Sequence, residues 1–88
     1  MICKRVQYSG RVQGVGFRYT TQSIASAYAV TGFVRNLPNG DVELVAQGSA
    51  EDVEAFLAAV ARKMAGYITD ARITDETPGD YKDFRIRY

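Results

Sequence analysis

The spacing of apolar residues changes repeatedly along this chain, and this alternation constrains the fold more than any other feature. From Cys3 to Val12 the side chains alternate in character, which is typical of a strand with one buried face. From Phe17 onward apolar residues recur at steps of three and four, which predicts an amphipathic helix of about 13 residues. That helix is expected to end at Thr31-Gly32. The chain therefore begins with a strand, a loop and a helix.

A turn signal and a second alternating segment follow this helix. Residues 33–37 are rich in β-forming side chains, and residues 41–48 again alternate between apolar and polar. Asn39-Gly40 lies between them and is typical of a type I′ hairpin, which needs positive φ at both central residues. An antiparallel hairpin is therefore expected, with one face of its second strand in the core. The other face is expected to meet solvent through Asp41, Glu43 and Gln47.

The next segment carries the clearest helical pattern in the chain. Ser49 is a suitable N-cap, and the acidic Glu51 and Asp52 suit the positive end of a helix. Gly66 is suited to end the helix. Its apolar stripe consists of Val53, Phe56, Leu57, Val60 and Met64.

Two further strands are expected after this helix. Residues 67–77 are rich in β-formers, and residues 84–88 alternate cleanly. Ala71 and Ile73 are expected to point inward from the first of these strands. Pro78-Gly79-Asp80 marks a turn between them.

This order of elements predicts one architecture. Each helix has a single apolar stripe and each strand a single apolar face, so both helices are expected on the same side of the sheet. Right-handed crossovers then interleave the two halves. We expect an α+β fold of the ferredoxin-like class, a two-layer α/β sandwich with βαββαβ order, an antiparallel sheet and an added C-terminal edge strand. Its 88 residues suit a single domain, 1–88.

The loop between the first strand and the first helix has the composition of a small-anion site. Glycines stand at positions 10, 14 and 16, and Arg18 follows in the first turn of the predicted helix. Glycine permits positive φ, so the amides of such a loop can turn inward as an anion-binding nest beside the helix N-terminus. An arginine is unfavourable at that positive end unless an anion lies beside it. The alternative is a tight structural connection with a solvated Arg18.

Composition argues against several functional classes. The net charge is +1 with 24% charged residues of mixed sign, unlike proteins that bind nucleic acid through its backbone. Histidine is absent and Cys3 is the only cysteine, so we expect no metal site and no Ser-His or Cys-His nucleophile. The chain shows no run of about 20 apolar residues, no signal peptide and no heptad pattern. We therefore expect a cytoplasmic monomer that binds neither membrane nor nucleic acid.

Two motifs resemble signatures of the acylphosphatase family, and the resemblance covers essentially the whole chain. The first runs from Gly10 to Arg18 and looks like that family's phosphate loop, with its catalytic arginine in the last position. The second runs from Gly32 to Asn36 and is followed by Gly40, Val42 and Gly48. The resemblance implies hydrolysis of small carboxylic acyl phosphates to carboxylate and inorganic phosphate, without metal or organic cofactor.

The resemblance also implies a role for each site residue. Arg18 would hold the phosphoryl group, and Asn36 would orient the attacking water. The backbone amides expected to bind phosphate are those of Gln13, Gly14, Val15, Gly16 and Phe17. Without the resemblance, Asn36 would be interpreted as a polar residue of the hairpin. Because no histidine can serve as a base, we hypothesise that the water passes its proton to the phosphate itself.

Two other functions compete with this interpretation. RNA-recognition modules share the predicted order of strands and helices, but they need aromatic residues on the central strands for base stacking. Residues 41–47 contain none. A sensor that binds a small anion in the same nest without turnover is not excluded by the sequence.

Overall fold

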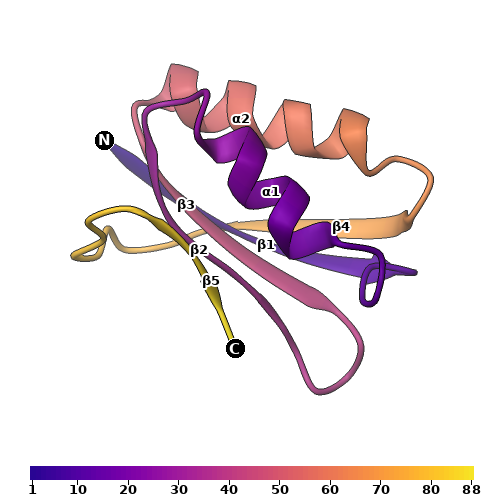
Figure 1. Cartoon of the computed structure of the whole chain (residues 1–88). Helices are drawn as coiled ribbons and strands as arrows, with labels where there is room; N and C mark the ends of the chain where they lie inside the picture. Colours follow the sequence, from indigo (N-terminus) through magenta and orange to yellow (C-terminus); the bar gives the residue numbers. More distant parts are fainter.

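The five strands form one sheet in the order β4-β1-β3-β2-β5, and two helices cover one of its faces (Figure 1). The computed structural model describes all 88 residues. In chain order the elements are β1 (Ile2–Gly10), α1 (Phe17–Ala25), β2 (Val30–Asn36), β3 (Val42–Gly48), α2 (Ala50–Lys63), β4 (Ile68–Asp75) and β5 (Phe84–Arg87). The predicted ferredoxin-like α+β sandwich is confirmed, including its C-terminal edge strand. Neither helix is long and apolar enough to cross a bilayer.

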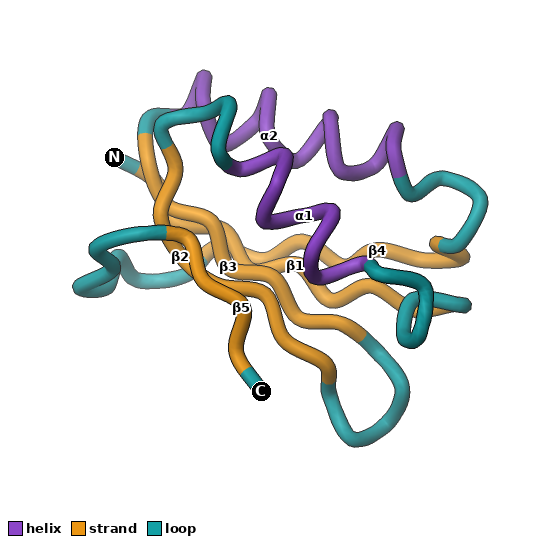
Figure 2. Tube along the Cα trace, in the orientation of Figure 1, coloured by secondary structure: helices purple, strands orange, loops and turns teal.

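β5 joins the sheet in a different orientation from the other strands. β1 pairs antiparallel with β3 and β4, and β2 pairs antiparallel with β3, whereas β5 lies parallel to β2. Residues 76–83 lead from β4 at one edge of the sheet to β5 at the other (Figure 2). Arg87 of β5 pairs with Arg35 of β2, so the chain ends beside the end of β2.

The main core lies between the helices and the sheet, as the apolar stripes predict. Phe56 of α2 is fully buried, with its ring centroid 6.1 Å from that of Tyr28 and 5.3 Å from that of Phe84. α2 begins at the predicted cap, because the Asp52 N–H donates to the Ser49 hydroxyl at 3.1 Å. Both the stripe and the cap of α2 are therefore confirmed.

The first helix is shorter than predicted. α1 ends at Ala25, and residues 26–29 form a turn before β2 starts at Val30. Thr31 and Gly32 therefore belong to β2, where they pair with β3. The apolar spacing continued past the helix because Tyr28 still packs against the core from the turn.

The hairpin between β2 and β3 is present, but its turn is not of type I′. That turn requires positive φ at Asn39, and no residue other than glycine has positive φ. Instead, the Leu37 N–H donates to the Asp41 carbonyl at 2.8 Å and the Gly40 N–H donates to the Leu37 carbonyl at 3.2 Å. These bonds enclose a loop that starts at Pro38, which suits the first position of an ordinary turn, and ends at Gly40, whose φ is 94°.

The sheet face opposite the helices, called here the helix-free face, is partly covered. We expected Glu43 and Gln47 to meet solvent, but they are only 6% and 5% exposed. Gln47 exchanges two hydrogen bonds with the backbone of Gly79, whose segment crosses this face. Glu43 accepts hydrogen bonds from Arg5 at 2.6 Å and Arg35 at 2.7 Å. The alternating pattern identified the faces correctly, but it did not reveal the covering segment.

Ala71 and Ile73 lie on the inward face expected for residues 67–77, but they are not buried. β4 is an edge strand that pairs only with β1, and Ile73 remains 58% exposed. Ile73 and Ala71 pair with the core residues Val6 and Tyr8, so they lie on the helix side of the sheet. Ile73 stays exposed because an open groove lies between it and α2.

Candidate active site

The loop between β1 and α1 offers a run of backbone N–H groups without acceptors in the protein. Gly14 has φ 77° and Gly16 has φ 75°, so both occupy the left-handed region that favours glycine. Gly16 is the N-cap of α1, and no side chain caps the helix. The first amide after the loop with a backbone acceptor is that of Thr20, which donates to Gly16 O at 3.0 Å. The amides of residues 13–19 are therefore available to an anion.

Arg18 lies in the first turn of α1 beside the last residue of the chain. Its side chain is half-buried, and its Cζ is 4.8 Å from the ring centroid of Tyr88. It forms no ion pair with any carboxylate of the protein. A cation held over an aromatic ring keeps the N–H groups at its edge free to donate. Arg18 thus lies against Tyr88 and has no carboxylate partner in the protein.

Tyr88 is in turn linked to the helix that carries Arg18. Its hydroxyl lies 3.2 Å from that of Tyr19, and this hydrogen bond raises the pKa of Tyr88. Both rings are largely exposed, so they form a rim rather than part of the core.

Asn36 is the last residue of β2 and lies at the same end of the sheet as Tyr88. Its strand neighbour Arg35 pairs with Arg87 of β5, so Asn36 and Tyr88 both follow directly after this pair. Asn36 also pairs with Val42 of β3, whose side chain is in the core, so it faces the helix side. No side-chain hydrogen bond occupies its amide, while Asn39 bonds within the hairpin instead. Asn36 is therefore not used by the turn.

Gln13 has a role that the sequence did not reveal. We expected only its backbone amide to take part, but its side-chain Nε2 donates to Leu37 O and to Asp41 O, both at 2.8 Å. These bonds join the glycine loop to the hairpin directly after Asn36. A polar residue between glycines gave no signal of this contact, because its acceptors lie in a distant part of the sequence.

The remaining predicted site residues anchor the loop. Phe17 is 2% exposed, and its ring centroid is 5.1 Å from that of Tyr8 in β1. Burial raises the pKa of Tyr8, whose hydroxyl is therefore not an acid or base near neutral pH. Val15 packs partly against the same core. The start of α1 is thus fixed to the sheet beneath the free amides.

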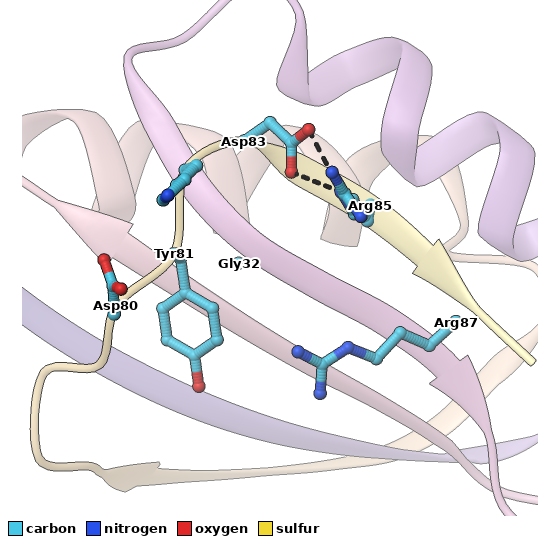
Figure 3. A pocket seen from close by; sticks show the side chains of 7 residues that line it. Gly32, Asp80, Tyr81, Asp83, Arg85 and Arg87 are labelled. Carbon is cyan, nitrogen blue, oxygen red and sulfur yellow. Dashed lines mark hydrogen bonds and ion pairs between the residues drawn. The ribbon is translucent and has the colours of Figure 1, made fainter.

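No three side chains of His, Cys, Asp or Glu gather closely enough to hold a metal ion. The unbonded groups of the candidate site are instead backbone amides, the guanidinium of Arg18 and the carboxamide of Asn36. Such a set can bind an oxyanion and direct a neutral water molecule. A separate cavity on the helix-free face contains none of these residues (Figure 3).

Comparisons with known proteins match the chain along its length. The acylphosphatase family profile matches residues 4–86. A curated acylphosphatase of Methanothrix thermoacetophila is 41% identical over 88 residues, covering 99% of this chain and 98% of the relative. One of Syntrophotalea carbinolica is 42% identical, covering 96% and 94% respectively. The crystal structure of acylphosphatase from Bacillus subtilis shares 33% identity at a TM-score of 0.90, covering 100% of both chains.

Proposed function

This chain belongs to the acylphosphatase family and hydrolyses acyl phosphates, and we propose that the loop between β1 and α1, with Arg18 and Asn36, performs this reaction. The substrate is a small carboxylic acyl phosphate, and the products are a carboxylate and inorganic phosphate. One observation carries the proposal: free amides, an arginine without an anionic partner and an unused carboxamide lie at the same end of the sheet.

The phosphoryl group is held by the amides of residues 13–17 and by the guanidinium of Arg18. Phosphoryl transfer requires positioning and charge stabilisation more than covalent chemistry from the protein. The donors are fixed before substrate arrives, because glycine conformations shape the loop and Tyr88 supports Arg18. Preorganised donors of this kind stabilise the charge on the phosphoryl oxygens without reorganising during the reaction.

Asn36 orients the attacking water. Its carboxamide can accept a hydrogen bond from water and donate another to a phosphoryl oxygen, which sets the line of approach. The chain contains no histidine. The water therefore passes its proton to a phosphoryl oxygen of the substrate, and the carboxylate leaves as the P–O bond to the acyl group breaks.

The test is phosphate release from benzoyl phosphate in the presence of excess chelator. Arg18→Gln and Asn36→Ala should each lower kcat by about 10²- to 10³-fold, as does the loss of a preorganised donor elsewhere. Arg62→Gln, at an exposed position of α2, and Asn39→Ala, in the hairpin, are matched controls and should keep the parent rate. Circular dichroism verifies folding. Parent-like rates in both site variants would refute the proposed residue roles, although hydrolysis itself would stand.

We further propose that residues 1–88 act as a single monomeric domain in the cytoplasm. The lone Cys3 is free and buried in β1, as suits a reducing compartment. Size-exclusion chromatography with light scattering should give the mass of one chain. A dimer at working concentration would overturn this expectation.

A further inference from the structure

Positive charge is in excess on the helix-free face near the end of β5. Arg35 and Arg87 pair in register on neighbouring strands, so their side chains start from the same face. Like charges placed beside one another on a sheet are destabilising. The nearby carboxylate of Glu43 is already bound by Arg5 and Arg35. Arg87 has no carboxylate partner.

The Arg87 side chain is nevertheless held in place. Its Cζ lies 3.9 Å from the ring centroid of Phe33, which is itself 7% exposed. Stacking on a ring uses the face of the guanidinium and leaves its N–H edges free. Arg87 therefore presents a fixed fork of donors, the geometry that matches a carboxylate or phosphate.

A cavity of about 230 Å³ adjoins Arg87. Tyr81 also lines it, and Figure 3 shows the Arg87 side chain extending toward Tyr81. Tyr81 makes no hydrogen bond through its hydroxyl, and its ring packs 6.0 Å from Phe33. The remaining lining residues are Gly32, Asp80, Lys82, Asp83 and Arg85.

The charged side chains that line the cavity carry one net positive charge. Asp83 accepts two hydrogen bonds from Arg85 Nε, at 2.8 and 3.1 Å, so this pair is internally neutralised. Asp80 and Lys82 carry opposite charges without forming an ion pair, so the one charge in excess is that of Arg87. A singly charged anion would balance the site.

The walls of the cavity are fixed to the sheet. The buried Gln47 side chain bonds both the N–H and the carbonyl of Gly79, at 2.8 and 2.9 Å. The Gly32 N–H donates to the Asp83 carbonyl at 2.9 Å. Residues 79–83 therefore hold the cavity open as part of the fold rather than as a loose loop.

We propose that this cavity is a second anion site, which binds a small oxyanion such as phosphate or a simple carboxylate. Arg87 supplies the donor fork, and the Tyr81 hydroxyl donates to the same anion. The volume is below the roughly 300–1,000 Å³ typical of sites for larger organic ligands, so a small anion fits best. This site does not depend on the roles proposed for Arg18 and Asn36.

An anion bound at this site would also stabilise the end of β5 in the sheet. β5 is a short edge strand of four residues, and Tyr88 follows Arg87 directly. Short terminal strands open readily unless side chains anchor them. An anion that binds Arg87 anchors this strand and so holds Tyr88 against Arg18.

The test is an NMR titration of the full chain carrying Arg18→Gln, which weakens the loop site. Sodium phosphate and sodium acetate are added separately at constant ionic strength. Saturable shifts are expected for the amides of residues 79–83 and for the Arg87 Nε–H. Saturation by phosphate, by acetate or by both supports the site and identifies the anion. Its absence with both overturns the proposal.

Three variants in the same background separate specific binding from general screening. Adding Arg87→Gln should weaken binding at least tenfold, whereas Arg72→Gln, an exposed arginine on the same face, should leave it unchanged. Tyr81→Phe removes only the hydroxyl and should weaken binding even if Arg87→Gln is poorly folded. Equal weakening by Arg72→Gln and Arg87→Gln, or full affinity in Tyr81→Phe, would overturn the proposal.

Discussion

Replacing Gln13 by methionine tests whether the glycine loop and the hairpin must be held together for catalysis. Methionine keeps a similar length but has no N–H to donate. In the parent, Gln13 Nε2 donates to Leu37 O and Asp41 O, both at 2.8 Å. The substitution therefore removes both bonds and leaves the loop backbone unchanged in sequence.

The stability cost of Gln13→Met depends on the hydrogen bonds that the Leu37 and Asp41 carbonyls keep after the substitution. Leu37 O still accepts from the Gly40 N–H, and Asp41 O still accepts from the Leu37 N–H. Neither acceptor is left without a partner, so each lost bond costs only its net contribution of about 0.5–1 kcal/mol. We expect Gln13→Met to lower the free energy of unfolding by about 1–2 kcal/mol.

The kinetic effect should be larger than the loss of stability suggests. The amides and Arg18 that hold phosphate lie on one side of the lost contact, and Asn36 lies on the other. A displacement of about 1 Å between such groups can cost about 10²-fold in rate. We expect kcat to fall by about 10- to 10²-fold, while the Ki of inorganic phosphate changes little because its donors remain.

Steady-state hydrolysis of benzoyl phosphate and inhibition by phosphate measure the two quantities separately. Gln22→Met is the matched control, because Gln22 is exposed on α1 and its only side-chain hydrogen bond is long, at 3.4 Å. A folded Gln13→Met protein with the kcat of the parent would refute this positioning role. A parallel loss of kcat and phosphate affinity would show instead that the loop itself had collapsed.

Three further predictions concern stability. Phe56→Ala should cost about 3–5 kcal/mol in chemical unfolding, because its fully buried ring packs against two others; an unchanged midpoint would contradict this packing. Burial alone would raise the pKa of Glu43, but Arg5 and Arg35 outweigh it and lower that pKa. Its stabilising effect is therefore complete above the unfolded-state pKa, about 4.3, and is lost as pH falls through the lower folded value. The difference in unfolding free energy between the parent and Glu43→Gln should shrink on acidification. A difference that grows would mean that folding raises the pKa of Glu43 instead of lowering it. Ile73→Ala should change stability by about 0.5 kcal/mol or less, and a core-sized loss would mean that β4 is covered in solution.

Much of the candidate site could be predicted because its determinants are local. Gly14 and Gly16 adopt positive φ, as a glycine-rich strand-to-helix loop suggests, and Arg18 lies in the first turn of the helix that follows. Asn36 also lies in the β-rich segment expected at residues 33–37, although β2 ends at Asn36. The side-chain role of Gln13 could not be predicted, because its acceptors belong to a hairpin far along the chain.

The same distinction explains the errors in the predicted fold. The inward position of Ile73 was inferred from alternation, which identifies a face but not whether a helix covers it. The burial of Glu43 and Gln47 depends on a segment that returns across the sheet after β4. Periodicity within one strand carries no information about that later segment.

By itself, the sequence determined the order of the elements, the apolar stripe of each helix and the positions in the loop where positive φ is permitted. These depend on hydrophobic period and backbone freedom over a few neighbouring residues. Only the tertiary structure decided that Tyr88 supports Arg18, that Gln13 joins loop and hairpin, and that an unpaired Arg87 adjoins a cavity. Those contacts join residues distant in sequence, so they arise only once the sheet has fixed which strands lie side by side.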